Sequence, residues 1–132
     1  MSSALRVGVF DDSAMARLTT TRLLQRAHME TVEIQNWDEL LQHLPQLQLL
    51  LLDVSLGDED GREVARRLRL HEQARQLSRL PVIALTAHAD EELVQSFLRA
   101  GYDDYLHKPF RPQQLYDKIQ NWTASSGGAS PS

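Results

Sequence analysis

The chain has 132 residues, 42% of them hydrophobic and 24% charged, and this length suits a single domain with one buried core. Lys and Arg number 14 and Asp and Glu number 18, so the formal net charge is −4, which argues against direct binding to nucleic acid. The sequence has no cysteine, which excludes disulfide frameworks, thiolate metal sites and cysteine nucleophiles. No apolar run is long enough to cross a bilayer and the N-terminus shows no signal pattern, so we expect a cytoplasmic protein without membrane insertion.

Short apolar runs alternate along the chain with segments of helical periodicity. Strands are predicted at residues 5–10, 31–34, 47–52, 82–85 and 104–107. Helices are predicted at residues 13–28, 37–44, 63–76, 91–100 and 112–122, with a loop at 57–61. Five alternations of strand and helix predict an α/β fold: a doubly wound five-stranded parallel sheet with five helices and the strand order 2-1-3-4-5.

Several helix ends carry recognisable signals. Asn36, with Glu39 three residues later, resembles a capping box, and Asp90 is expected to cap the fourth helix. Gly101 directly follows the fourth predicted helix, at the position where a left-handed backbone favours glycine. Pro112 suits the first position of the last helix.

The helices are expected to bury only one side each. The first helix is predicted to turn inward Ala16, Thr20, Leu23, Leu24 and Ala27. The charge-rich stretch 62–79 is predicted to be a solvated helix face. Its inward positions are predicted to be Val64, Leu68 and His71.

Composition changes at the C-terminal end of the chain. Residues 123–132 are only Ser, Gly, Ala, Thr and Pro, which is typical of a flexible tail or linker. We therefore expect one folded domain over residues 1–122 and no internal repeat.

Polar residues follow four of the five predicted strands. Asp11 and Asp12 end the first strand, Asp53 the third, Thr86 the fourth and Lys108 the fifth. Ligands of such sheets bind at the carboxyl ends of the strands, so these side chains are predicted to share one pocket. Three neighbouring carboxylates repel one another, and a hard divalent cation, Mg²⁺ before Ca²⁺, would relieve that repulsion. A lysine and a threonine hydroxyl beside them favour an incoming phosphoryl group, with a carboxylate as nucleophile.

Each of these residues alone also allows a structural interpretation. Asp11 and Asp12 could cap the first helix, Thr86 could satisfy backbone groups, and Lys108 could be a solvated surface lysine. Asp53 is harder to explain in this way, because a carboxylate at the end of a buried strand is costly without partners. The joint occurrence, more than any single residue, favours a functional site.

The sequence resembles the receiver domain of two-component response regulators, which has a flavodoxin-like fold. The resemblance covers residues 5–122. It rests on Asp11-Asp12, the segment 53–61, Thr86-Ala87, and the segment 100–110 with Tyr105 and Lys108-Pro109. Gly57 and Glu59 depart from the family, which commonly has proline and a hydrophobic residue at these places. Ser55 and His88 occupy positions that tune dephosphorylation there.

The resemblance implies a role for each matching residue. Asp53 would be the phospho-acceptor, and Mg²⁺ would be held by Asp11, Asp12, Asp53 and the main-chain carbonyl of Ser55. Thr86 would turn toward the phosphoryl group and Lys108 would pair with its oxygens. Tyr105 would be the switch aromatic on the face formed by the fourth helix, fifth strand and fifth helix. Pro109 would follow a cis peptide bond.

The resemblance also implies partners. A sensor histidine kinase or a histidine phosphotransfer protein would donate the phosphoryl group in a two-component system or phosphorelay. A phosphorylation-linked dimer is a further expectation. Met15 and Leu18 of the first helix, with Pro109, form the expected contact patch. The chain would then be a signalling switch without turnover of an external substrate, either stand-alone or excised from a hybrid kinase.

Other functions stay open as alternatives. A receiver-like docking module that works without phosphorylation would keep the fold, although retention of all five pocket residues counts against it. A phosphatase of the haloacid-dehalogenase type would want an acid where Ser55 stands. Flavin and dinucleotide binding are disfavoured by the acidic first turn and by the lack of G-x-G-x-x-G after any strand.

Overall fold

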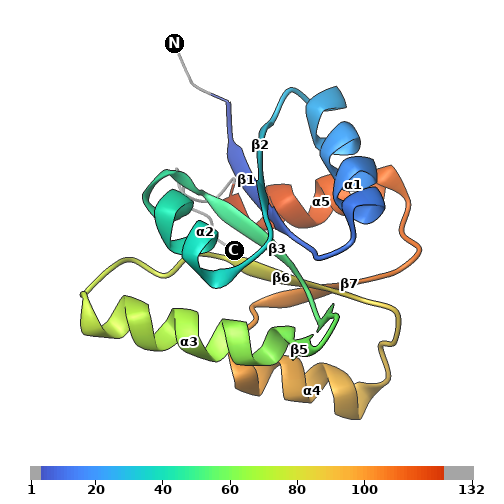
Figure 1. The fold of residues 1–132 in the computed structure, drawn as a ribbon. Coiled ribbons are helices and arrows are strands. Elements are labelled where there is room, and N and C mark those ends of the chain that lie inside the picture. Colours follow the sequence, from blue (N-terminus) through green and yellow to red (C-terminus); the bar gives the residue numbers. More distant parts are fainter. Residues whose placement is uncertain (1–3, 124–132) are drawn as a thin grey trace.

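A computed structural model describes residues 4–123 of the chain (Figure 1). Five parallel strands form one sheet in the order β2-β1-β3-β6-β7. The strands are β1 (Arg6–Phe10), β2 (Glu30–Ile34), β3 (Leu49–Asp53), β6 (Val82–Thr86) and β7 (Asp104–His107). This is the predicted order 2-1-3-4-5, so the fold expected from the sequence is confirmed.

Helices cover both faces of the sheet. They are α1 (Ala14–Arg26), α2 (Trp37–His43), α3 (Gly61–Ala74), α4 (Glu91–Ala100) and α5 (Pro112–Thr123). α1 and α5 lie on one face, and α2, α3 and α4 lie on the other (Figure 1). A short 3₁₀ turn, Leu44–Gln46, follows α2 at Pro45.

The most apolar run of the sequence forms the central strand β3. All five of its residues are buried, because helices pack on both sides of it. Leu49 and Leu51 pack toward α1 and α5, and Leu50 and Leu52 pack toward α2, α3 and α4. Alternation of side chains along a strand thus splits one leucine run between two hydrophobic cores.

The predicted helix-end signals are confirmed. Asn36 accepts from the Glu39 N–H at 2.9 Å, and the Glu39 carboxylate accepts from the Gln35 N–H at 2.8 Å. Asp90 caps α4, and Gly101 ends it with a φ of 123° that disfavours any residue with a Cβ. Pro112 is the first residue of α5, and Thr123, expected in the tail, is its last. Residues 124–132, the rest of the predicted tail, lie outside the described residues.

Some local predictions differ from the structure. The expected loop at 57–61 is part of a small antiparallel pair, β4 (Ser55–Leu56) and β5 (Glu59–Asp60), and α3 starts two residues early because Asp60 caps it. On α1, Thr20 and Leu24 are buried as expected and the half-buried Leu23 packs against the core, but Arg17 and Thr21 are buried too, and Ala16 and Ala27 are only half-buried. Burial of Arg17 is possible because its guanidinium donates to the main-chain carbonyl of Asp11 at 2.6 Å and pairs with Glu33 at 3.2 Å.

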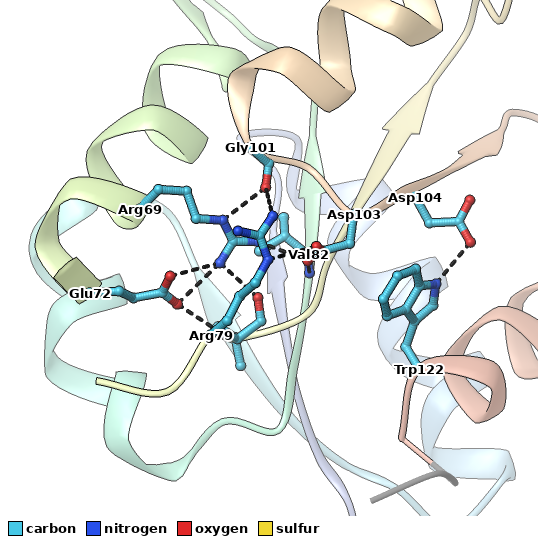
Figure 2. A network of polar contacts seen from close by, with 9 residues as sticks. Arg69, Glu72, Arg79, Val82, Gly101, Asp103, Asp104 and Trp122 are labelled. Atoms are coloured by element: carbon cyan, nitrogen blue, oxygen red, sulfur yellow. Dashed lines mark hydrogen bonds and ion pairs between the residues drawn. The ribbon is translucent and has the colours of Figure 1, made fainter. Parts of the chain in front are cut away.

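The stretch 62–79 is also not uniformly solvated, because Arg69 and Glu72 are buried at the far end of α3 (Figure 2). The Arg69 guanidinium pairs with Glu72 at 2.9 Å and with Asp103 at 2.8 Å, and it donates to the main-chain carbonyls of Leu80 and Gly101. The two carboxylates accept in turn from the main-chain N–H groups of Leu80 and Val82. These contacts join α3, the start of β6 and the turn between α4 and β7.

Asp104, the next residue after Asp103, faces the other side of the sheet. Its carboxylate accepts from the Trp122 indole at 2.9 Å (Figure 2) and pairs with Lys118 at 2.8 Å, and both partners belong to α5. Two successive aspartates therefore fix the start of β7 to both helix layers. Within residues 4–123, no helix has the length and apolar character that a bilayer crossing requires.

Candidate functional site

The five predicted site residues come together. Asp11, Asp12, Asp53, Thr86 and Lys108 line one pocket of about 490 Å³ at the carboxyl ends of β1, β3, β6 and β7. A larger pocket, about 850 Å³, lies at the opposite ends of these strands beside residues such as Leu5, Leu47 and Pro81. The smaller pocket is the candidate site, because it gathers the carboxylates, the hydroxyl and the ammonium group that the chemistry requires.

Asp53 is held by two donors at the bottom of this pocket. Its Oδ2 lies 2.6 Å from the Lys108 Nζ, and its Oδ1 accepts from the Ser55 N–H at 2.8 Å. The same Nζ lies 3.8 Å from Oδ2 of Asp11. Lys108 therefore places one positive charge between two buried carboxylates, which limits their mutual repulsion.

Asp11 is almost fully buried and does not cap α1. Its Oδ1 accepts from the Ser13 N–H at 2.9 Å, while the cap of α1 is the Ser13 hydroxyl, which accepts from the Ala16 N–H. Burial raises the pKa of Asp11 to about 6; the Ser13 N–H opposes this rise, the Asp53 carboxylate adds to it, and Lys108 lowers it. The capping alternative is thus unsupported for Asp11, whose carboxylate belongs to the pocket.

The raised pKa of Asp11 predicts a pH effect on stability. The folded chain holds this proton more tightly than the unfolded chain, so folding loses stability as pH rises from about 4 through about 6. Relative to Asp11→Asn, the wild-type protein should lose on the order of 2 kcal/mol across this range in a metal chelator, because each pKa unit corresponds to 1.36 kcal/mol. Urea unfolding of both proteins at pH 4, 5, 6 and 7 measures this loss. A difference in unfolding free energy between the two proteins that does not change with pH would contradict the prediction.

Asp12 is the exposed member of the acid pair at the rim of this pocket. Its Oδ2 lies 2.7 Å from the place where a Cβ on Gly57 would stand. Gly57 has a φ of 66°, so the turn between β4 and β5 requires glycine both for its backbone and for this close approach. Among residues 4–123, no three His, Asp or Glu side chains already stand in the arrangement of a metal site.

Thr86 ends β6, and Tyr105 lies on the neighbouring strand β7, two residues before His107, which pairs with Thr86. The Thr86 hydroxyl donates to the main-chain carbonyl of His88 at 2.7 Å and accepts from the His88 N–H at 3.1 Å, so it is engaged with its own loop. The Tyr105 ring is half-buried, with the Lys118 Nζ 5.3 Å from its centre. The peptide bond between Lys108 and Pro109 is cis, as expected.

The comparison with known families decides the identity. The family described as response regulator receiver domain matches residues 7–120. The chain belongs to this family. It is thus a signalling domain of the two-component and phosphorelay systems, and the flavodoxin-like receiver fold expected from the sequence is confirmed.

Individual relatives agree with this assignment. The sensor protein GacS of Pseudomonas syringae pv. syringae is 36% identical over 124 residues, which are 92% of this chain and 14% of that protein. This receiver domain therefore spans about one seventh of that relative's length. The receiver domain of sensor histidine kinase PA1611 from Pseudomonas aeruginosa PAO1 was crystallised with a magnesium ion coordinated in its active-site cleft. It is 26% identical, with a TM-score of 0.78, and the match covers 93% of this chain and 100% of that one.

A third match extends the likeness in fold. The co-crystal structure of the phosphotransfer protein Ypd1 with the receiver domain of Ssk1, both from Saccharomyces cerevisiae, matches with a TM-score of 0.87 at 21% identity. The match covers 98% of this chain and 96% of that one. At this identity the likeness concerns the fold alone.

The predicted contact patch of this receiver domain is exposed. Met15 is 73% and Leu18 is 40% exposed on α1, which starts directly after the acid pair, and Pro109 is exposed beside Lys108. Sequence reasoning missed Arg17, which holds the Asp11 carbonyl from the buried side of α1. In the sequence, nothing separates this arginine from a solvated arginine on a helix surface.

Proposed function

We propose that this receiver domain accepts a phosphoryl group on Asp53 in a Mg²⁺-dependent reaction and works as a phosphorylation-dependent switch. The observation that carries the proposal is the contact between Asp53 Oδ2 and Lys108 Nζ at 2.6 Å, in a pocket that also holds Asp11 and Thr86. Lys108 thus places a positive charge beside the carboxylate that would attack the phosphorus, where it would also face the oxygens of the incoming phosphoryl group.

The donor set suits a hard divalent cation. Asp11, Asp12, Asp53 and the main-chain carbonyl of Ser55 would hold Mg²⁺, which supplies positive charge against the oxygens of the incoming phosphoryl group. Oδ2 of Asp11 and Oδ2 of Asp53 lie 3.8 and 2.6 Å from the Lys108 Nζ. Burial and the neighbouring Asp53 carboxylate raise the pKa of Asp11, and a bound cation would favour its charged form. Asp12 lines the same pocket, with its carboxylate beside Gly57.

The transfer itself needs one nucleophile and one leaving group. An Asp53 carboxylate oxygen attacks the phosphorus of a phosphohistidine, and the new O–P bond forms as the P–N bond breaks. The electron pair of the P–N bond leaves on the imidazole nitrogen of the donor, which takes up a proton. Lys108 then moves its ammonium group from the carboxylate to the phosphoryl oxygens, where the negative charge now lies.

The response would begin at Thr86. Its hydroxyl leaves the His88 carbonyl and donates to a phosphoryl oxygen, which draws the loop after β6 toward the pocket. Tyr105 then turns inward into the space that this loop vacates. The face formed by α4, β7 and α5 is the surface that changes.

The partners follow from the same chemistry. A sensor histidine kinase or a histidine phosphotransfer protein would present its phosphohistidine over the pocket, with Met15, Leu18 and Pro109 as an apolar contact around it. A phosphorylation-linked dimer through the face of α4, β7 and α5 would be a further consequence. The domain acts in the cytoplasm, where it turns over no external substrate.

The test of the proposal is the intact mass of the protein after incubation with acetyl phosphate, with and without Mg²⁺. A gain of one phosphoryl group that requires Mg²⁺ is the expected result. The absence of any gain from acetyl phosphate and from a phosphorylated histidine phosphotransfer protein would overturn the proposal and favour a docking module that works without phosphorylation.

Lys108→Ala should impair the response more than it impairs metal binding. Lys108 carries the charge that pairs with phosphoryl oxygens, but it is itself a cation and cannot be a metal ligand. Mg²⁺ affinity should therefore stay the same or rise, because a competing positive charge is removed. Amide NMR shifts around Tyr105 after addition of beryllofluoride, which mimics a phosphoryl group on a carboxylate, report the response. Shifts as large as in the wild-type protein would remove this role from Lys108.

A further inference from the structure

The Tyr102 hydroxyl is a buried polar group without a hydrogen-bond partner. Tyr102 is 1% exposed, and among the described residues no donor or acceptor pairs with its oxygen. Unpaired buried groups lower stability and are uncommon in folded proteins, so this one requires an explanation. Nothing in the roles proposed above uses it.

The hydroxyl lies close to the backbone of the acceptor residue. Tyr102 follows Gly101 at the end of α4, and its ring packs edge-on against Phe97 with centroids 5.8 Å apart. A Cβ added to Gly61, the first residue of α3, would clash with both the Tyr102 hydroxyl oxygen and the Asp53 carbonyl oxygen. The two oxygens therefore flank the same point of the backbone, yet the hydroxyl has no partner.

The loop that follows the acceptor residue, residues 55–60, also ends at this point. The Gly61 N–H donates to the Val54 carbonyl at 2.6 Å and closes this loop, and the Tyr102 hydroxyl lies beside Gly61. Burial raises the pKa of Tyr102, and the carboxylates of Asp60 and Asp53 raise it further. The phenol is therefore neutral at any physiological pH and carries a proton that it can donate.

We infer that Tyr102 is a positioning residue whose hydroxyl donates to the main-chain carbonyl of Asp53 only in the phosphorylated domain. The inference rests on the proposed function, because the small shift of the Asp53 backbone that would bring its carbonyl to the hydroxyl would come from attachment of the phosphoryl group. A hydrogen bond that exists in one state and not in the other favours that state by its whole free energy. Tyr102 would thus tie the end of α4 to the acceptor and help hold the phosphorylated form.

Tyr102→Phe removes the hydroxyl and keeps the ring on Phe97. In the free protein the thermal unfolding temperature should stay the same or rise, because an unpaired buried group is lost. The affinity for beryllofluoride in the presence of Mg²⁺ should fall about fivefold to tenfold, the worth of one hydrogen bond. Calorimetry measures the affinity, and thermal unfolding without Mg²⁺ measures the stability.

Tyr116→Phe is the matched control. The Tyr116 hydroxyl donates to the main-chain carbonyl of Leu23 at 2.8 Å, between α5 and α1. This variant should unfold at a lower temperature and bind beryllofluoride with unchanged affinity. The pair of variants therefore separates loss of a hydroxyl in general from loss of this one.

Each outcome decides one claim. If Tyr102→Phe binds beryllofluoride as tightly as the wild-type protein, or if it loses stability in the free state, the positioning role is wrong and Tyr102 only fills the core. If the wild-type protein itself neither binds beryllofluoride nor takes up a phosphoryl group from any donor, the proposed function fails and the inference fails with it.

Discussion

Asp53→Asn is expected to abolish the uptake of a phosphoryl group while leaving the fold intact. The amide has the size of the carboxylate but lacks its charge and its nucleophilic oxygen, so no acyl phosphate can form. Asp53 lies at the end of the fully buried strand β3, where an isosteric side chain keeps the packing unchanged. Intact mass after incubation with acetyl phosphate and Mg²⁺ should show no gain in this variant.

Asp58→Asn is the control for Asp53→Asn. Asp58 is exposed in the turn between β4 and β5, so its replacement changes the net charge by the same amount near the same pocket. Its uptake should match that of the wild-type protein. Stable uptake by Asp53→Asn, with or without uptake by the control, would mean that another residue is the acceptor.

Arg69→Met is expected to destabilise the fold strongly. Removing one partner from a buried ionic network leaves charges without compensation and costs about 3–5 kcal/mol. Glu72 would lose the guanidinium that neutralises it, Asp103 would keep only Arg79, and two main-chain carbonyls would lose a donor. Urea unfolding followed by circular dichroism measures the loss.

Arg66→Met provides the comparison on the same helix. Arg66 pairs with Glu63 on the exposed side of α3, where an ion pair contributes about 0.5 kcal/mol or less. If Arg69→Met does not fold well enough for measurement, Arg69→Lys keeps the charge and should show an intermediate loss. A loss below about 1 kcal/mol for Arg69→Met would mean that the buried network does not hold the turn before β7.

The sequence could predict the sheet and the centre of the pocket because both follow from position along the chain. A strand that is apolar at every residue and ends in Asp53 has to be central in a parallel sheet, and the carboxyl ends of such strands meet. Asp11, Thr86 and Lys108 reach the pocket by the same rule. The two hydrophobic cores follow from the alternation of side chains between the two faces of the sheet along Leu49 to Leu52.

What the sequence could not predict depends on contacts between distant segments. Arg69 has the sequence context of a solvated charge, and its burial requires Asp103, 34 residues later, to neutralise it. In the sequence Tyr102 has the pattern of an ordinary core aromatic residue, and only the fold brings its hydroxyl close to the Asp53 carbonyl. The close approach of Asp12 to Gly57 depends on a left-handed turn, which no hydrophobic pattern in the sequence predicts.

The measurement that tests the central claim most directly is identification of the phosphorylated residue in the wild-type protein. After incubation with acetyl phosphate and Mg²⁺, borohydride reduces an acyl phosphate to an alcohol, and tandem mass spectrometry locates the changed residue. We expect the reduced residue at position Asp53 alone, and no reduced residue when Mg²⁺ is omitted. A change at any other residue, or one that does not need Mg²⁺, would contradict this expectation.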